Sequence, residues 1–150
     1  MATTIRPAAG VAATPALRHW SDVVGLAGAA PLILAADVHD RALAWLSHVP
    51  QLLSTALAAE LDQQFGEDPD RTLLAAAGPG VRDMTRLAGS SYALWRDILL
   101  TNSEPIDRAL ARMEQAIAHL RLHLRDREAE KLFRDAAALY DELRRGIKET

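Results

Sequence analysis

One histidine and two polar neighbours stand out on a stretch that is otherwise largely apolar. Residues 38–61 place large apolar side chains at helical spacing on two opposite sides, which predicts a buried helix. Between these sides runs a narrow strip of small and polar residues that contains Ser47 and Gln51, with His48 at its edge. A neutral histidine can donate one hydrogen bond and accept another. The strip is a candidate ligand site, although small residues also permit close helix packing and a core histidine can be purely structural.

An arginine in a largely apolar segment is the second candidate. Arg86 lies in the sequence VRDMTRLAG, one helical turn after Arg82. A guanidinium near a core needs a carboxylate, which can come from the protein or from a ligand. Asp83 is the local candidate for a protein partner. A structural salt bridge and a carboxylate-binding role are therefore both open for Arg86.

Other kinds of site have little support. His119 and His123 have a spacing that can chelate a metal, but no third ligand completes the set locally, and the flank of a helix-packing seam is the better interpretation. Gly78-Pro79-Gly80 matches neither a dinucleotide fingerprint nor a phosphate loop. The absence of cysteine excludes thiolate chemistry and suits the cytoplasm. A net charge of -3 without a basic block gives no sign of a nucleic-acid partner, and the longest apolar run is too short to span a membrane.

The 150 residues, 49% hydrophobic and 25% charged, predict one globular, mostly helical domain. Residues 1–13 are small and weakly patterned, which predicts a disordered tail. Thr14 and Pro15 should begin a helix, and a short strand is predicted over 31–35. A lone strand has no partner for its backbone groups. It should therefore pair across a dimer or against a domain outside this chain.

The remaining elements are predicted from caps and breakers. Asp37 should cap the central helix, Pro50 should kink it, and Gly66 should end it. Shorter helices are predicted over 71–77, 81–88 and 92–101. Ser103 should open a long helix, and Asp126 should separate it from a last one. These last two helices are predicted to form an antiparallel hairpin that packs on the central helix.

Three segments taken together resemble the C-terminal helical domain of the prephenate dehydrogenases. They are HDRALAWLSHVPQLL (39–53), GVRDMTRLAGSSYALWRDILLTN (80–102) and the helix over 106–124. They carry the motifs HD, SH-x-P, G-x-x-D-x-T-R and LW-x-D-I in the family's order, and the resemblance covers residues 14–143. It implies a mostly all-α, intertwined helical dimerisation domain with one short N-terminal strand. Residues 14–36 would be a helix-strand remnant of the family's nucleotide-binding domain, and residues 37–147 the substrate-binding and dimerisation domain.

The resemblance also assigns roles to particular residues. Arg86 is expected to bind a substrate carboxylate, and Ser47 and His48 to line the pocket. Gly80 and Trp95 correspond to family residues near the pocket. Gln51 replaces the second histidine of the family motif SHLPH, so it should still hydrogen-bond the substrate but cannot titrate near neutral pH.

The family carries out NAD- or NADP-dependent oxidative decarboxylation of prephenate, or of arogenate, in tyrosine biosynthesis. This sequence shows neither the nucleotide-binding half nor the family's catalytic histidine. We therefore expect the chain to bind no cofactor and to be inactive alone. Expected partners are a second copy in a homodimer, and prephenate, arogenate or tyrosine as ligand. Two alternatives are one chain of a split enzyme, with a separate Rossmann-domain chain, and a non-catalytic module that binds an aromatic acid or only dimerises.

Overall fold

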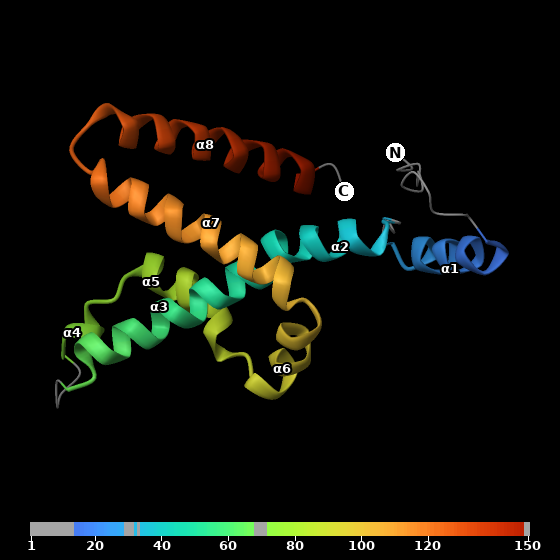
Figure 1. Cartoon of the computed structure of the whole chain (residues 1–150), viewed down its shortest axis with the longest axis horizontal. Coiled ribbons are helices and arrows are strands. Elements are labelled where there is room, and N and C mark those ends of the chain that lie inside the picture. The colour runs from blue at the N-terminus through green and yellow to red at the C-terminus, as the bar shows by residue number, and fades with distance from the viewer. Residues whose placement is uncertain (1–13, 29–31, 33, 68–71, 149–150) are drawn as a thin grey trace. The chain divides into compact units, whose positions relative to one another are not determined.

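The computed structural model describes residues 14–28, 32, 34–67 and 72–148, and these residues are mostly helical, without a β-strand among them (Figure 1). They fall into two compact units, with the division between Asp107 and Arg108. The predicted tail, residues 1–13, lies outside the described residues. The domain boundaries predicted at 14–36 and 37–147 stay predictions.

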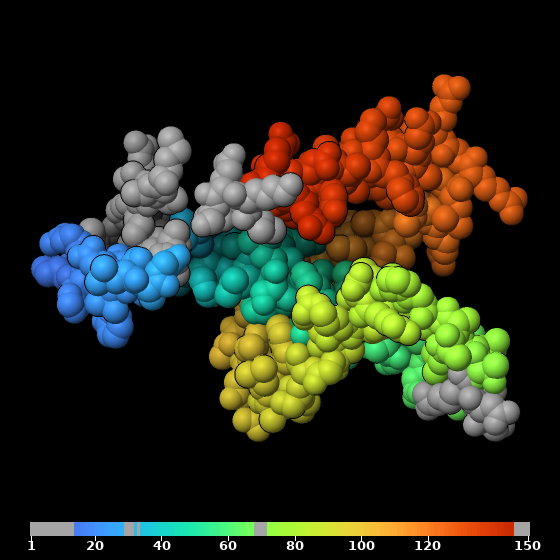
Figure 2. Space-filling view, turned by 180° about the vertical axis from the view of Figure 1, so that it is seen from behind, coloured from blue at the N-terminus to red at the C-terminus, as the bar shows by residue number. Residues whose placement is uncertain are grey.

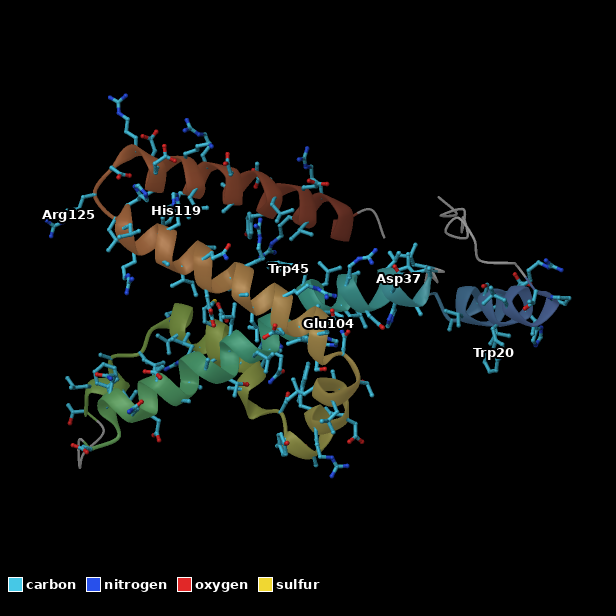
Figure 3. All side chains as sticks on the ribbon, viewed as in Figure 1. Trp20, Asp37, Trp45, Glu104, His119 and Arg125 are labelled. Carbon is cyan, nitrogen blue, oxygen red and sulfur yellow. The ribbon has the colours of Figure 1, made fainter. Side chains whose placement is uncertain are left out.

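Helix α1 spans Pro15–Leu26 and begins where the sequence predicts. Thr14 Oγ1 accepts a hydrogen bond from the Leu17 N–H at 3.2 Å, and Pro15 occupies the first helical position. Gly28, just beyond the end of the helix, adopts a φ of +82°, which glycine tolerates without strain. The helix has no buried residue, and Trp20 projects away from it (Figure 3). Only Leu17, Ser21 and Val24 of α1 are half-buried among its described residues, on the side that faces Leu32 and Leu34.

The strand predicted over 31–35 is not found in the described residues. Leu32, Leu34 and Ala35 belong to neither helix nor strand, and residues 31 and 33 lie outside the described part. A strand requires a neighbour to pair its N–H and C=O groups, and the described part of this single chain offers none. The fold is therefore all-α over the described residues. Formation of the strand against a partner stays a prediction.

The central helical rod consists of α2 (Ala36–Leu43), a π-helical turn η1 (Ala44–His48) and α3 (Val49–Phe65). The predicted cap is wrong, because Ala35 takes the N-cap position and Asp37 instead pairs with Arg41 across one turn at 2.8 Å. The irregularity predicted at Pro50 takes the form of the π turn. The Val49 N–H donates to the Ala44 carbonyl, five residues earlier. Pro50 has no N–H with which to restore the α pattern.

The most deeply buried part of this rod is the polar strip together with Val49. The prediction that both apolar sides are covered is wrong for a single chain, since Leu46 is 78% exposed and Trp45 is 44% exposed. The buried members of the strip are Ala44, His48, Gln51 and Ser54, and Val49 beside them is 1% exposed. Trp45 and Leu46 therefore remain free for contact with another surface.

Four short elements follow the rod: α4 (Thr72–Ala75), α5 (Pro79–Thr85), a 3₁₀ turn η2 (Arg86–Gly89) and α6 (Tyr92–Thr101). Gly78 is the N-cap of α5 and Pro79 its first residue, so the Gly-Pro-Gly sequence begins a helix as well as separating two. Ser91 precedes α6 at the predicted cap position. Figure 2 shows the segment 79–91, in yellow-green, against the central rod. These contacts place η2 beside α3.

The last two helices are α7 (Ser103–Leu122) and α8 (Arg127–Lys148), and the chain reverses direction between them (Figure 1). As predicted, Asp126 divides them. Its Oδ1 accepts from the Glu128 N–H at 2.9 Å, and its Oδ2 lies 2.6 Å from His123 Nδ1, a hydrogen bond that lowers the pKa of the Asp126 carboxyl. Arg125 points away from this turn (Figure 3). Packing of the two helices on the central rod stays a prediction.

Candidate functional site

His48 is held by an asparagine from the end of α6. Asn102 Nδ2 lies 3.1 Å from His48 Nδ1 and donates to the Asp40 carbonyl oxygen at 3.0 Å. Because a carbonyl oxygen can only accept, the NH₂ group of Asn102 must face it, and the same group then donates to His48. Nδ1 of His48 is therefore an unprotonated acceptor. The neutral ring carries its proton on Nε2.

Burial keeps this ring neutral. His48 is 6% exposed, and loss of hydration lowers its pKa below the ordinary value of 6.5. The Asp40 carboxylate raises the pKa and His39 lowers it further, both by smaller amounts. Trp95 packs nearly perpendicular to the ring, with centroids 5.8 Å apart and planes at 87°. The structure thus brings together two of the predicted site residues, His48 and Trp95.

Gln51 ties α3 to η2. Its Nε2 donates to the Leu87 carbonyl at 2.8 Å and to Thr55 Oγ1 at 3.3 Å, and its Oε1 accepts from Ser90 Oγ at 3.3 Å. Both ends of the amide are therefore occupied by protein groups. The predicted hydrogen bond from Gln51 to a substrate stays a prediction, and it would compete with these contacts.

Arg86 is the first residue of η2 and directly precedes the Leu87 carbonyl that Gln51 holds. Its side chain is exposed and forms no ion pair within the described residues, so the salt bridge with Asp83 left open by the sequence is not made. A guanidinium on an anchored turn, without a protein carboxylate, can take an anionic group from a ligand.

The other two predicted site residues lie at the surface. Ser47 is exposed in the π turn beside His48. Gly80 is exposed in α5, and no atom lies within 4 Å of the point where a Cβ would stand. Neither is brought into contact with the His48 cluster by a hydrogen bond among the described residues.

Asn102 is the residue that the sequence did not point to. It stands between two predicted helices, where an asparagine is usual at a helix end, and it is 54 residues from His48. Its Oδ1 and the Ser54 hydroxyl oxygen are buried without a hydrogen-bond partner among the described residues. An unpartnered buried polar atom costs about 1–3 kcal/mol, so the orientation of Asn102 must be favoured by its two donor contacts.

Gly78-Pro79-Gly80, which matches no phosphate-binding motif in the sequence, begins the seven-residue helix α5. The rings of His119 and His123 have centroids 4.4 Å apart and planes tilted by 42°, and Asp126 adds a carboxylate beside His123. Even so, the part of the chain that is described contains no group of three His, Cys, Asp or Glu side chains able to hold a metal ion. None of the helices in the described part is long and apolar enough to cross a membrane.

Comparison with known families decides the class of this helical domain. Residues 35–137 match the sequence model of the prephenate dehydrogenase dimerization domain. The chain belongs to this family. It is similar to the prephenate dehydrogenase of Bacillus subtilis strain 168, with 33% identity over 101 residues, which are 67% of this chain and 27% of that protein. It is likewise similar to the prephenate dehydrogenase of Lactococcus lactis subsp. cremoris strain MG1363, with 29% identity over 101 residues, 67% of this chain and 28% of that protein.

Solved structures support the same family. The A. aeolicus prephenate dehydrogenase, solved in complex with hydroxyphenyl propionate and NAD+, superposes with a TM-score of 0.66 and 26% identity, covering 89% of this chain and 46% of that one. The Synechocystis arogenate dehydrogenase shares the fold, with a TM-score of 0.69 and 24% identity over 87% of this chain and 48% of its own. The chain thus spans under a third of its curated relatives and under half of these solved chains. The family predicted from the motifs is confirmed.

Proposed function

We propose that this chain is the substrate-binding and dimerisation portion of a prephenate dehydrogenase-like protein of tyrosine biosynthesis in the cytoplasm. One observation carries the proposal. Within the family domain, Arg86 stands exposed and without an ion pair among the described residues, on a turn that Gln51 anchors to the helix bearing His48. An arginine held in this way is suited to a ligand carboxylate.

The ligand is an aromatic or cyclohexadienyl acid, with prephenate, arogenate and tyrosine as the candidates. Arg86 binds its carboxylate, Trp95 supplies an apolar wall, and Ser47, Gly80 and Gln51 complete the lining in the family's manner. The A. aeolicus relative was solved with hydroxyphenyl propionate, which combines a ring with a carboxylate and supports this class. The proton on His48 Nε2 gives the site a neutral donor as well.

The partner is a second copy of the chain, in an intertwined homodimer. The name of the family domain supports this, and so does the apolar surface that one chain leaves exposed. At least half exposed are Trp20, Leu26, Leu46, Leu94, Leu100, Leu122, Phe133, Leu139 and Leu143. A second chain that covers these side chains would stabilise both copies.

Oxidation with NAD or NADP is assigned to a nucleotide-binding domain and not to these residues, because no dinucleotide fingerprint occurs in the 150 residues. In the split-enzyme alternative a separate Rossmann-domain chain would dock on residues 14–36, where the strand predicted over 31–35 could form against it. An apolar groove of about 400 Å³, lined in part by Leu17, Trp20 and Leu34, offers such a chain a surface. The second alternative is a module that binds an aromatic acid without catalysis.

Calorimetric titration of tyrosine, and then of prephenate, into the purified chain tests the proposal. Arg86→Ala should weaken binding by about 2–5 kcal/mol, roughly 30-fold or more, because a desolvated carboxylate loses its charged partner. Arg82→Ala is the matched control, since Arg82 is an exposed arginine one turn earlier. Equal losses in the two variants would contradict the role of Arg86. No binding by the folded chain would leave dimerisation as its function.

A further inference from the structure

Asn102 uses its side chain as a double donor between two distant parts of the chain. One N–H of Nδ2 goes to the Asp40 carbonyl in α2, and the other goes to His48 Nδ1 in the π turn. These contacts span 62 and 54 residues, and no side-chain hydrogen bond joins Asn102 to its own helix among the described residues. A role limited to capping α6 would require neither contact.

The contacts require an amide at this position. Aspartate has no hydrogen to give to the Asp40 carbonyl, and serine has only one. The cost of this arrangement falls on the amide oxygen Oδ1 of Asn102, which is buried and accepts no hydrogen bond from the part of the chain that is described. The orientation of Asn102 is therefore set by what its NH₂ group donates to, and the acceptor at Nδ1 leaves the ring proton on Nε2.

We propose that Asn102 is a positioning residue that holds His48 in its Nε2–H tautomer, so that the ring donates a hydrogen bond to a carboxylate or carbonyl oxygen of the bound acid. This inference rests on the proposed function. Among the described residues, Nε2 of His48 has no hydrogen-bond partner of its own. A ligand oxygen would supply the missing acceptor.

The groups around His48 agree with this role. On α2, the Asp40 carboxylate and His39 act on the ring with opposite signs, and from α6 the contacts are the uncharged Trp95 and Asn102. The Asp40 carboxylate favours the cationic ring, but loss of hydration outweighs it, and the pKa of His48 is lowered. A neutral N–H donor with a fixed direction binds an acceptor oxygen of the ligand without adding a positive charge to the site.

The test is the nitrogen NMR spectrum of the His48 ring in the 15N-labelled chain, assigned by comparison with His48→Gln. Without ligand, Nε2 should show the shift of a protonated nitrogen and Nδ1 that of an unprotonated one. Asn102→Asp should reverse the two assignments and raise the pKa of His48, because a carboxylate accepts from Nδ1–H. Asn102→Ala should give a mixture of tautomers. Thr101→Ala, which loses only hydrogen bonds to the Asp97 and Ile98 carbonyls of its own helix, should leave the ring unchanged.

Two results would overturn the inference: a native His48 protonated on Nδ1, or an Asn102→Asp variant that folds by circular dichroism but keeps the native ring spectrum. Calorimetry with tyrosine then tests the ligand step, where Asn102→Asp should bind about tenfold or more weakly while Thr101→Ala binds normally. If the native chain shows the expected tautomer but binds no acid, the proposed function fails while the positioning of His48 stands. If the native chain binds and Asn102→Asp binds equally well, the positioning role fails alone.

Discussion

A buried neutral histidine makes the stability of the fold depend on pH. The pKa of His48 lies below 6.5 in the folded chain, whereas an unfolded histidine titrates near 6.5. Between these two values the unfolded state binds more protons than the folded state, so the free energy of unfolding rises with pH. The stabilisation that depends on a neutral His48 ring is fully present at pH values above the pKa of the unfolded state. It is lost as pH falls toward the folded pKa.

The first prediction concerns this pH window. Between about pH 7.5 and pH 5, the free energy of unfolding of the native chain should fall more steeply than that of His48→Gln, which has no ring to protonate. Urea unfolding at one fixed chain concentration measures both. His19→Gln is the control, because His19 is exposed in α1. Parallel pH profiles for the native chain and His48→Gln would contradict the buried neutral state.

The sequence identified the ionisable residues of the site better than it identified their partners. His48 and Arg86 stand out because a polar side chain in an apolar segment is unusual, and this can be seen in one sequence. Asn102 could not be recognised, since its importance comes from a contact with a residue 54 positions away. Gln51 was recognised, but its main partner is the backbone carbonyl of Leu87, and a backbone group leaves no mark on the residue type.

Gln51 also determines how two elements are joined, because its amide links α3 to η2. Gln51→Leu should lower the free energy of unfolding by about 1–3 kcal/mol, since it leaves the Leu87 carbonyl and the Ser90 hydroxyl without this partner. Chemical denaturation measures the change. Gln63→Leu, at an exposed position of the same helix, should change stability much less. A similar loss in both variants would mean that the amide contacts contribute little.

Element boundaries followed the sequence where a local residue determines them. Thr14 with Pro15 and Asp126 mark boundaries correctly, because capping hydrogen bonds and the proline ring act within one turn. Ser91 also stands at the N-cap position of α6, although its side chain makes no capping hydrogen bond. The short strand is not found in the described residues, because its pairing depends on another segment. The Asp37 cap failed for a different reason, since a carboxylate in the first turn can pair with Arg41 instead.

The extent of exposed apolar surface indicates that one chain is an incomplete folding unit. In α8, Leu139 and Leu143 are four residues apart and so share one face of the helix, and they are 56% and 59% exposed. The all-α family fold was predictable from motifs and helical periodicity. The sequence did not predict which sides of the central rod remain exposed, because periodicity shows that a side is apolar but not which surface covers it.

The last prediction tests the dimer through α8. Size-exclusion chromatography with light scattering should give about twice the 16.3 kDa of one chain. Leu139→Lys should shift the chain toward monomer, because it places a charge in an apolar interface. Asp141→Asn is the control, because it also makes the chain one unit more positive but lies on the opposite side of α8. It should leave the dimer intact. A native chain that stays monomeric at high concentration would contradict the homodimer.

The π turn amounts to the insertion of one residue into an otherwise continuous helix. Each residue advances an α-helix by about 100° around its axis. The added residue therefore determines how far α2, which precedes Ala44, is rotated about the helix axis relative to α3, which follows His48. Deleting one residue from this turn would leave α2 and α3 helical but would turn the Asp40 carbonyl away from Asn102. A single insertion in the main chain thus brings the two acceptors of that asparagine, one before the turn and one at its last residue, to the same amide.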